Sequence, residues 1–110
     1  MISNHGGRQL DTSPAPIEVL AEIVDAVGDR LEGILEGGVR RGVHVMKALA
    51  LGATACSAGR PYLFGLCAGG EAGVDRALEI FRIDIERDMR LLGCRNVAEI
   101  DSTRIRKVSK

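Results

Sequence analysis

The first clear alternation of hydrophobic and polar positions spans residues 17–27 of the 110-residue chain, where apolar side chains recur every three or four positions. This spacing predicts an amphipathic helix with one face to bury. Residues 13–16 read Ser-Pro-Ala-Pro, which favours a helix start with a capping hydroxyl from Ser13 and prolines at the entry. Gly28 is typical of a helix end.

Two short apolar runs, residues 31–35 and 54–58, are predicted as buried strands, because both lead into glycine-rich turns. Gly33 weakens the first strand, since glycine lowers strand stability and leaves a gap in packing. Between the two strands, residues 43–50 carry apolar side chains at helical spacing, and Gly52 ends this predicted helix.

The longest hydrophobic pattern covers residues 74–92 and ends at Gly93, which predicts a long amphipathic helix. Residues 62–66 are too few to assign to a helix or a strand. Residues 95–110 carry several cations, the last of them Lys110, and we predict a solvated C-terminal tail. A small anion-binding patch is the alternative interpretation of the same residues.

Helices and strands therefore alternate along the chain, an order that is typical of parallel βα units. Parallel strands need neighbouring strands and cover on both faces. Only two whole strands and a short segment before His5 are predicted, whereas a closed barrel of βα units needs about 250 residues. We expect the chain to be one part of a larger parallel sheet.

Composition restricts the classes of partner. Fifteen basic residues balance 15 acidic ones, so no net field draws the chain to nucleic acid or an anionic membrane. Aromatic residues make up 3% of the chain, which argues against a base-stacking surface. No apolar run reaches the ~20 residues of a membrane span, and we expect no signal peptide after Met1. Three widely spaced cysteines form no metal or redox motif, which favours reduced thiols in a cytoplasmic protein.

Both predicted strands lead into glycines followed by arginine. The two segments are Glu36-Gly37-Gly38-Val39-Arg40 and Gly59-Arg60. Glycine lets the backbone approach a ligand closely and aim its N–H groups at it, and arginine is a planar donor suited to phosphate. Neither segment is a dinucleotide fingerprint or a P-loop. The pair predicts a phosphate site, and ordinary turns with solvated arginines are the alternative.

Acid–base chemistry is indicated by the stretch "SNHGGRQLD" at residues 3–11. The imidazole of His5 can accept a proton near neutral pH, and Arg8 can hold a carboxylate by two parallel hydrogen bonds. A base beside a carboxylate clamp suits proton removal from an acid substrate. From spacing alone, an exposed loop histidine and a surface arginine stay an open alternative, and His44 is expected to be structural or exposed.

Five segments in order resemble one known family: "SNHGGRQLD", "EGGVRRG", "KALALGA", "GRPYLFGLCAGGEAGV" and "LLGC". They are similar to the C-terminal part of the FMN-dependent α-hydroxy acid dehydrogenases and oxidases, which include glycolate oxidase, L-lactate dehydrogenase and mandelate dehydrogenase. The resemblance covers nearly all of this chain. It implies the C-terminal portion of a (β/α)₈ TIM barrel, comprising the end of strand six and then strands seven and eight with their helices.

The resemblance also implies roles for individual residues. His5 corresponds to the base that acts on the substrate, and Arg8 corresponds to the arginine that binds the substrate carboxylate. The FMN-binding positions correspond to Glu36, Gly37, Gly38, Val39, Arg40, Gly59 and Arg60. The implied reaction oxidises a small 2-hydroxy acid to a 2-oxo acid, with FMN as cofactor and no metal. Full-length relatives are expected to be homo-oligomers.

Five positions depart from the family pattern. Glu36 stands where aspartate is usual, and the additional methylene is expected to displace its carboxylate. Val43 and His44 stand where Thr-Asp is usual, so we expect a helix cap worth ~1 kcal/mol to be missing. Gly33 replaces a β-branched residue and Ala58 replaces isoleucine, changes that affect packing more than chemistry.

The expected organisation is βα units in residues 1–94 and a tail in residues 95–110, as part of a barrel whose first strands the chain does not carry. Three hypotheses follow. The chain is a C-terminal fragment of a 2-hydroxy acid oxidoreductase that is inactive alone; it is a non-catalytic α/β remnant that binds a phosphate-containing ligand; or it is half of a split protein whose partner chain supplies the other strands.

Overall fold

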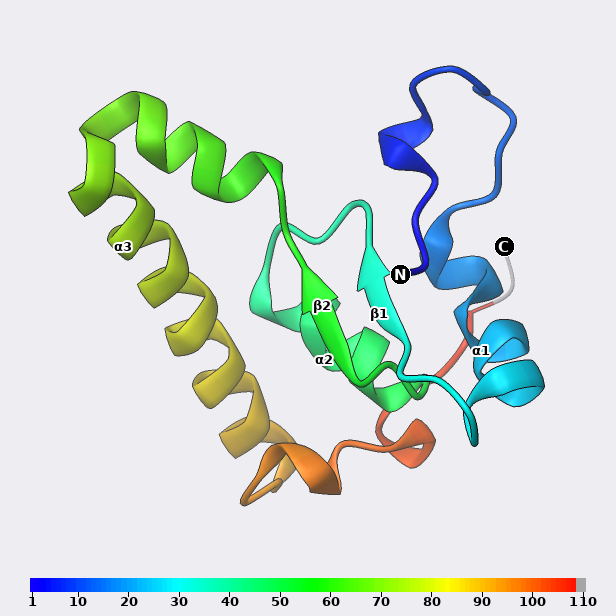
Figure 1. The fold of residues 1–110 in the computed structure, drawn as a ribbon. Helices are drawn as coiled ribbons and strands as arrows, with labels where there is room; N and C mark the ends of the chain where they lie inside the picture. Colours follow the sequence, from blue (N-terminus) through cyan, green and yellow to red (C-terminus); the bar gives the residue numbers. More distant parts are fainter. Residues whose placement is uncertain (109–110) are drawn as a thin grey trace.

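Parallel strands form the centre of the fold in the computed structural model, which describes residues 1–108 (Figure 1). The described elements are a 3₁₀ turn at His5–Gly7, α1 at Pro16–Val27, β1 at Ile34–Glu36, α2 at Gly42–Ala50, β2 at Ala55–Ser57, α3 at Arg60–Leu92, and 3₁₀ turns at Val97–Glu99 and Ser102–Arg104. Lys110, the last cation of the predicted tail, lies outside the described residues.

The strands confirm the predicted parallel βα arrangement. β1 and β2 pair in parallel, with Leu35 opposite Cys56. Ile2 joins the other side of β1 through a parallel bridge to Leu35, so three segments run in the same direction. Both strands are shorter than predicted. Gly33 lies just outside β1, where its carbonyl accepts the N–H of Thr54 at 2.8 Å.

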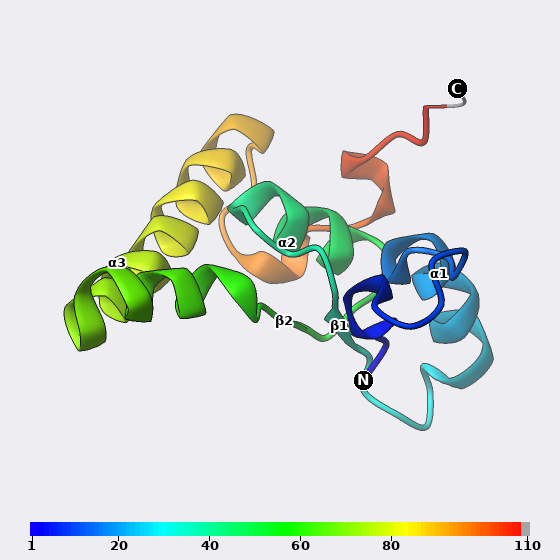
Figure 2. The same cartoon turned by 90° about the horizontal axis from the view of Figure 1, so that it is seen from above.

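One face of this sheet carries the core. Leu35, in the middle of β1, is 2% exposed and packs with Leu20 of α1 and Ala48 of α2. Figure 2 shows α2 over one face of the strands, with α1 on one side and α3 on the other. Ile34 and Glu36 alternate with Leu35 and are only half-buried. The described part of the chain therefore places its helices together on the Leu35 side.

The start of α1 differs in one detail from the prediction. The N-cap residue is Ala15 rather than Ser13, and Pro16 is the first helical residue. The side chain of Glu18 accepts the backbone N–H of Ala15 at 3.0 Å, so a carboxylate performs the capping that was predicted for the Ser13 hydroxyl. Gly28 ends the helix as predicted.

α3 is much longer than the pattern of residues 74–92 predicted. It begins at Arg60 and includes the unassigned residues 62–66, but its backbone leaves helical geometry at Gly69 and Gly70. The chain turns back there, and Figure 1 shows the two arms of α3 forming a hairpin. The arms touch at Gly65 and Gly73, because a methyl group on Gly73 would lie 1.9 Å from the Gly65 carbonyl oxygen.

The segment after α3 packs more closely than a solvated tail. Ile100 is 6% exposed and forms a second core cluster with Met46, Ala50 and Cys94. A 3₁₀ turn leads into this residue: Asn96 caps the turn, and the Ile100 N–H donates to the Val97 carbonyl. The prediction of a solvated tail is therefore wrong at Ile100. None of the helices in residues 1–108 is long and apolar enough to cross a membrane.

Candidate active site at the carboxyl ends of the strands

A cavity of about 280 Å³ opens where the parallel strands end, and it is lined by Gly6 and by residues 36–40 and 57–61. All seven predicted cofactor-binding residues lie in these two ranges. The carboxyl ends of parallel strands meet at one edge of a sheet, which is where ligands bind in α/β proteins. The structure thus brings together the two glycine–arginine segments that the sequence singled out.

The first wall of the cavity is the turn after β1. Gly37 has φ +111° and Gly38 has φ +73°, a region of backbone conformation that favours glycine. A side chain at Gly37 would meet the ring of Pro16 at 3.0 Å, whereas a side chain at Gly38 would meet open space. In this turn, no hydrogen bond between described residues uses the N–H groups of Gly38 or Val39. These amides are therefore available to an anion.

The second wall is the start of α3. Gly59 is the N-cap residue of this helix, and nothing lies within 4 Å of the position that a methyl group would take there. Arg60 follows at the first helical position, and its guanidinium reaches the turn at His5–Gly7. A methyl group on Gly6 would lie 3.2 Å from the Arg60 Nη2 atom, so the glycine leaves room for the arginine.

The turn that carries His5 adjoins this cavity. His5 is exposed and has φ +56°, in the left-handed region that few residues other than glycine adopt. Two side chains hold the turn: the Ser3 hydroxyl oxygen accepts the His5 N–H at 2.9 Å, and the Asn4 Oδ1 atom accepts the Gly6 N–H at 3.1 Å. Strained backbone of this kind persists where surrounding bonds enforce it.

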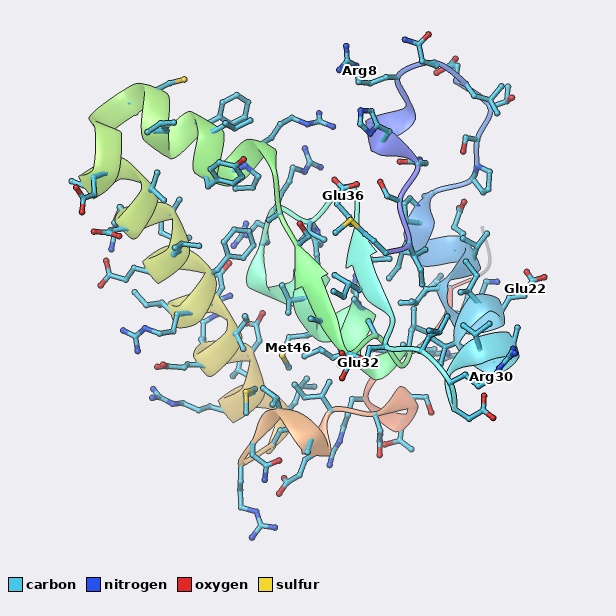
Figure 3. All side chains as sticks on the ribbon, viewed as in Figure 1. Arg8, Glu22, Arg30, Glu32, Glu36 and Met46 are labelled. Carbon is cyan, nitrogen blue, oxygen red and sulfur yellow. The ribbon has the colours of Figure 1, made fainter. Side chains whose placement is uncertain are left out.

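Neither His5 nor Arg8 lines the cavity itself. Arg8 lies on the exposed loop above the carboxyl end of β1, as Figure 3 shows. Among residues 1–108, the Arg8 guanidinium makes no ion pair with a carboxylate. The structure therefore places the predicted base and clamp beside the cavity, in the same turn as Gly6, which lines it.

Glu36 does not lose its contacts through the additional methylene. Its carboxylate oxygen Oε2 accepts the hydroxyl of Ser3, while its backbone N–H donates to the Ile2 carbonyl at 2.9 Å. The longer side chain of glutamate therefore keeps a hydrogen-bond partner, Ser3, which precedes the turn that carries His5.

Asp84 supports the site from α3, and the sequence pattern gave no reason to select it. This carboxylate is 7% exposed, and its Oδ2 atom accepts the Arg41 Nε–H at 3.3 Å and the Gly42 N–H at 3.4 Å. Burial opposes its ionisation, but these hydrogen bonds and the pairing with Arg87 outweigh burial, so the pKa of Asp84 lies below its ordinary value. Asp84 thereby fastens the end of the turn after β1 to α3.

The start of α2 confirms the prediction that its side-chain cap is missing. The N-cap residue Arg41 has no side-chain cap, but the Nδ1 atom of His44 accepts the backbone N–H of Arg40 at 3.2 Å. A carboxylate or amide at the third helical position makes a similar bond in a capping box. His44 is therefore structural, as expected, but its bond holds the residue before the N-cap and leaves the helix without a side-chain cap from its N-cap residue.

These features fit the phosphate end of a cofactor. Unpartnered backbone amides, an open glycine wall and the arginine at the start of α3 are the donors that phosphate prefers. Complete ligand sites usually measure about 300–1,000 Å³, so a cavity of about 280 Å³ suits one end of a ligand rather than a whole flavin. The fold and site define an α/β protein with a cavity suited to a phosphate group, beside an exposed turn that carries a histidine.

Comparison with known proteins identifies the family. The sequence model of the family described as FMN-dependent dehydrogenase matches residues 1–107. The chain is 53% identical over 107 residues to 2-hydroxyacid oxidase 1 of Mus musculus, covering 97% of this chain and 29% of that protein. It is 46% identical over 109 residues to L-lactate oxidase of Lactobacillus jensenii, covering 99% and 27%. The chain belongs to the FMN-dependent dehydrogenase family, whose cofactor is FMN.

Solved structures agree with this assignment. A soluble mutant of the membrane-associated (S)-mandelate dehydrogenase from Pseudomonas putida superposes with a TM-score of 0.88 at 44% identity, covering 93% of this chain and 29% of the other. A flavocytochrome b2 mutant with pyruvate bound gives a TM-score of 0.85 at 46% identity, covering 99% and 32%. The chain spans less than a third of the proteins that it matches. It folds as part of the α/β barrel of these flavoenzymes.

The cellular location does not follow from these relatives. They include a peroxisomal (S)-2-hydroxyacid oxidase of Arabidopsis thaliana as well as the membrane-associated mandelate dehydrogenase. The expectation of a cytoplasmic protein therefore stays a prediction.

Proposed function

We propose that this chain carries the C-terminal part of the active site of an FMN-dependent oxidoreductase that converts a 2-hydroxy acid into a 2-oxo acid. The observation that carries the proposal is the cavity between the two glycine–arginine turns, with the His5 turn packed against Arg60 at its rim. Relatives named as 2-hydroxyacid oxidase and L-lactate oxidase support the choice of substrate class.

In this proposal the phosphate of FMN binds to the amides of residues 37–39 and to the start of α3. The positive end of the α3 dipole and the guanidinium of Arg60 favour the negative charge there. Arg40 and Glu36 complete the wall on the β1 side. When bound, FMN supplies the electron acceptor for oxidation of the substrate.

The substrate carboxylate binds to Arg8 through a bidentate charge-assisted pair. A ring nitrogen of His5 then accepts the proton that the substrate loses on oxidation. The exposed loop that carries both residues lets them reach a substrate over the cavity rim. Assignment of Ile2, β1 and β2 to the end of strand six, strand seven and strand eight of the barrel belongs to the same proposal, as does the division into residues 1–94 and 95–110.

A chimera tests this function in a complete barrel. Residues 1–107 of this chain replace the matching segment of 2-hydroxyacid oxidase 1 of Mus musculus, with which they share 53% identity. We expect the purified chimera to keep its flavin after desalting and to oxidise a 2-hydroxy acid. In the His5→Ala chimera we expect turnover to fall by roughly 10²–10⁴-fold with full flavin content. A His5→Ala chimera with undiminished turnover would show that His5 is not the base.

A further inference from the structure

One hydrogen-bonded chain links the cofactor turn to the base. The carboxylate of Glu36 accepts the Ser3 hydroxyl, and the Ser3 oxygen accepts the His5 N–H at 2.9 Å. Glu36 also lines the cavity. One residue therefore lines the cavity and holds, through one intervening serine, the turn that carries His5.

The chemistry of serine makes Glu36 important to this contact. A hydroxyl has one hydrogen to donate and two lone pairs that accept. Once that hydrogen is committed to Glu36, the lone pairs of the Ser3 oxygen stay directed at the His5 N–H. The negative charge of Glu36 also polarises the hydroxyl, which strengthens the bond that its oxygen accepts.

The turn needs such support, because His5 has φ +56°. A residue with a side chain leaves this conformation readily when its hydrogen bonds are lost. The length of the side chain at position 36 matters equally. Aspartate is shorter than glutamate by one carbon–carbon bond of about 1.5 Å, so an aspartate at this position ends short of Ser3.

We propose that Glu36 is a positioning residue for the base: it fixes the Ser3 hydroxyl, and Ser3 fixes the backbone of His5 in its left-handed conformation. The functional meaning of this role rests on the proposed function, because His5 is the base only there. The linkage itself is a property of the chain without flavin. Binding of FMN beside Glu36 and the placement of His5 are thereby coupled.

Hydrogen exchange of the His5 amide, followed by NMR on the isotope-labelled 110-residue chain without flavin, tests the linkage. We expect Ser3→Ala and Glu36→Ala each to speed this exchange about fivefold, the factor for one ordinary hydrogen bond. The double variant should exchange no faster than Ser3→Ala, since both changes break the same chain of bonds. Glu36→Gln should retain protection, because its amide oxygen still accepts from Ser3.

Two controls separate positioning from general damage. Glu32→Ala removes a carboxylate near the opposite end of β1, as Figure 3 shows, and should leave the His5 amide unchanged. The Ile2 amide, which donates to the Ile34 carbonyl at 2.8 Å, reports whether each variant keeps its sheet. If an alanine variant loses the sheet, the Glu36→Asp variant tests the linkage in its place. It should speed hydrogen exchange of the His5 amide while the Ile2 amide stays protected.

An unchanged His5 exchange rate in Glu36→Asp or Glu36→Ala, with Ile2 protected, would overturn the proposal. Loss of protection in Glu36→Gln equal to that in Glu36→Ala would overturn it as well. Because no flavin is present, these results do not depend on whether the chain binds FMN. A failure of the chimera to hold flavin contradicts the proposed function and leaves the Glu36–Ser3–His5 linkage standing.

Discussion

Alanine substitutions at Gly59 and Gly42 should separate binding of the cofactor from stability of the fold. Gly59 has φ −89° and ψ −74°, a conformation open to any residue, and a methyl group there meets no atom within 4 Å. A methyl group on Gly42 would lie 2.5 Å from the Asp84 Cβ atom and 2.7 Å from the Ile85 backbone nitrogen. The first change fills the cavity, and the second forces α2 away from α3.

The expected magnitudes follow from these contacts. Gly59→Ala should leave the free energy of unfolding unchanged or raise it by about 0.4–1 kcal/mol, since it only restricts the unfolded chain. The methyl group should nevertheless cost one charge-assisted hydrogen bond to phosphate, about 1.5–3 kcal/mol, which weakens FMN binding roughly 10- to 150-fold. Gly42→Ala should lower the free energy of unfolding by about 1–3 kcal/mol through overpacking.

Both variants are made in the chimera, with urea unfolding as the stability assay and recovery of flavin fluorescence on release as the binding assay. We expect Gly59→Ala to lose FMN at unchanged apoprotein stability and Gly42→Ala to lose apoprotein stability. Wild-type affinity for FMN in Gly59→Ala would refute the reasoning, because the open space beside Gly59 would then lie outside the cofactor site. Equal destabilisation of the two apoproteins would refute the contact argument.

Three further predictions concern charge and core packing. In the chimera, Arg60→Ala should weaken FMN retention more than Arg8→Ala, and the reverse order in desalted samples would exchange the roles of the two arginines. Because the fold lowers the pKa of Asp84, its ionised form stabilises the chain at pH values above about 3.9, the pKa of aspartate in an unfolded chain. This stabilisation should disappear as the pH falls through the lower folded pKa. When the urea midpoint of unfolding is plotted against pH, the Asp84→Asn variant should therefore lose less stability below about pH 4 than the unchanged chain. The fold also lowers the pKa of Asp101, but this residue contributes equally to both proteins. Leu20→Ala should cost about 2–5 kcal/mol in urea unfolding, since Leu20 is fully buried, and a loss below 1 kcal/mol would contradict the core assignment.

The predictable parts of the fold are those that local pattern controls. The spacing of apolar residues located α1 and α2, and Gly93 ends α3 in the left-handed conformation with φ +70°. The first arm of α3 was not predicted, because residues 62–66 are too few to assign from their pattern. The structure shows that both arms are helical and that they meet at Gly65 and Gly73, which is a tertiary contact.

The predictable parts of the candidate site are those that glycine, arginine or histidine marks directly after a strand. The two glycine–arginine turns and the stretch around His5 are sequence signals, and the parallel register brings the turns together. Asp84 and Ser3 could not be selected in advance. Asp84 acts across 42 positions of sequence on the Gly42 amide, and Ser3 matters because β1 places Glu36 beside it. Such contacts depend on register, which no local pattern encodes.

Titration of the isotope-labelled 110-residue chain with FMN and with riboflavin tests the central claim most directly. The claim is that the turns at residues 36–40 and 59–60 bind the phosphate of the cofactor. We expect FMN to shift the amide resonances of Gly38, Val39 and Gly59, and we expect riboflavin, which lacks the phosphate, to leave them in place. Equal shifts with both flavins, or FMN shifts confined to other parts of the chain, would contradict the account.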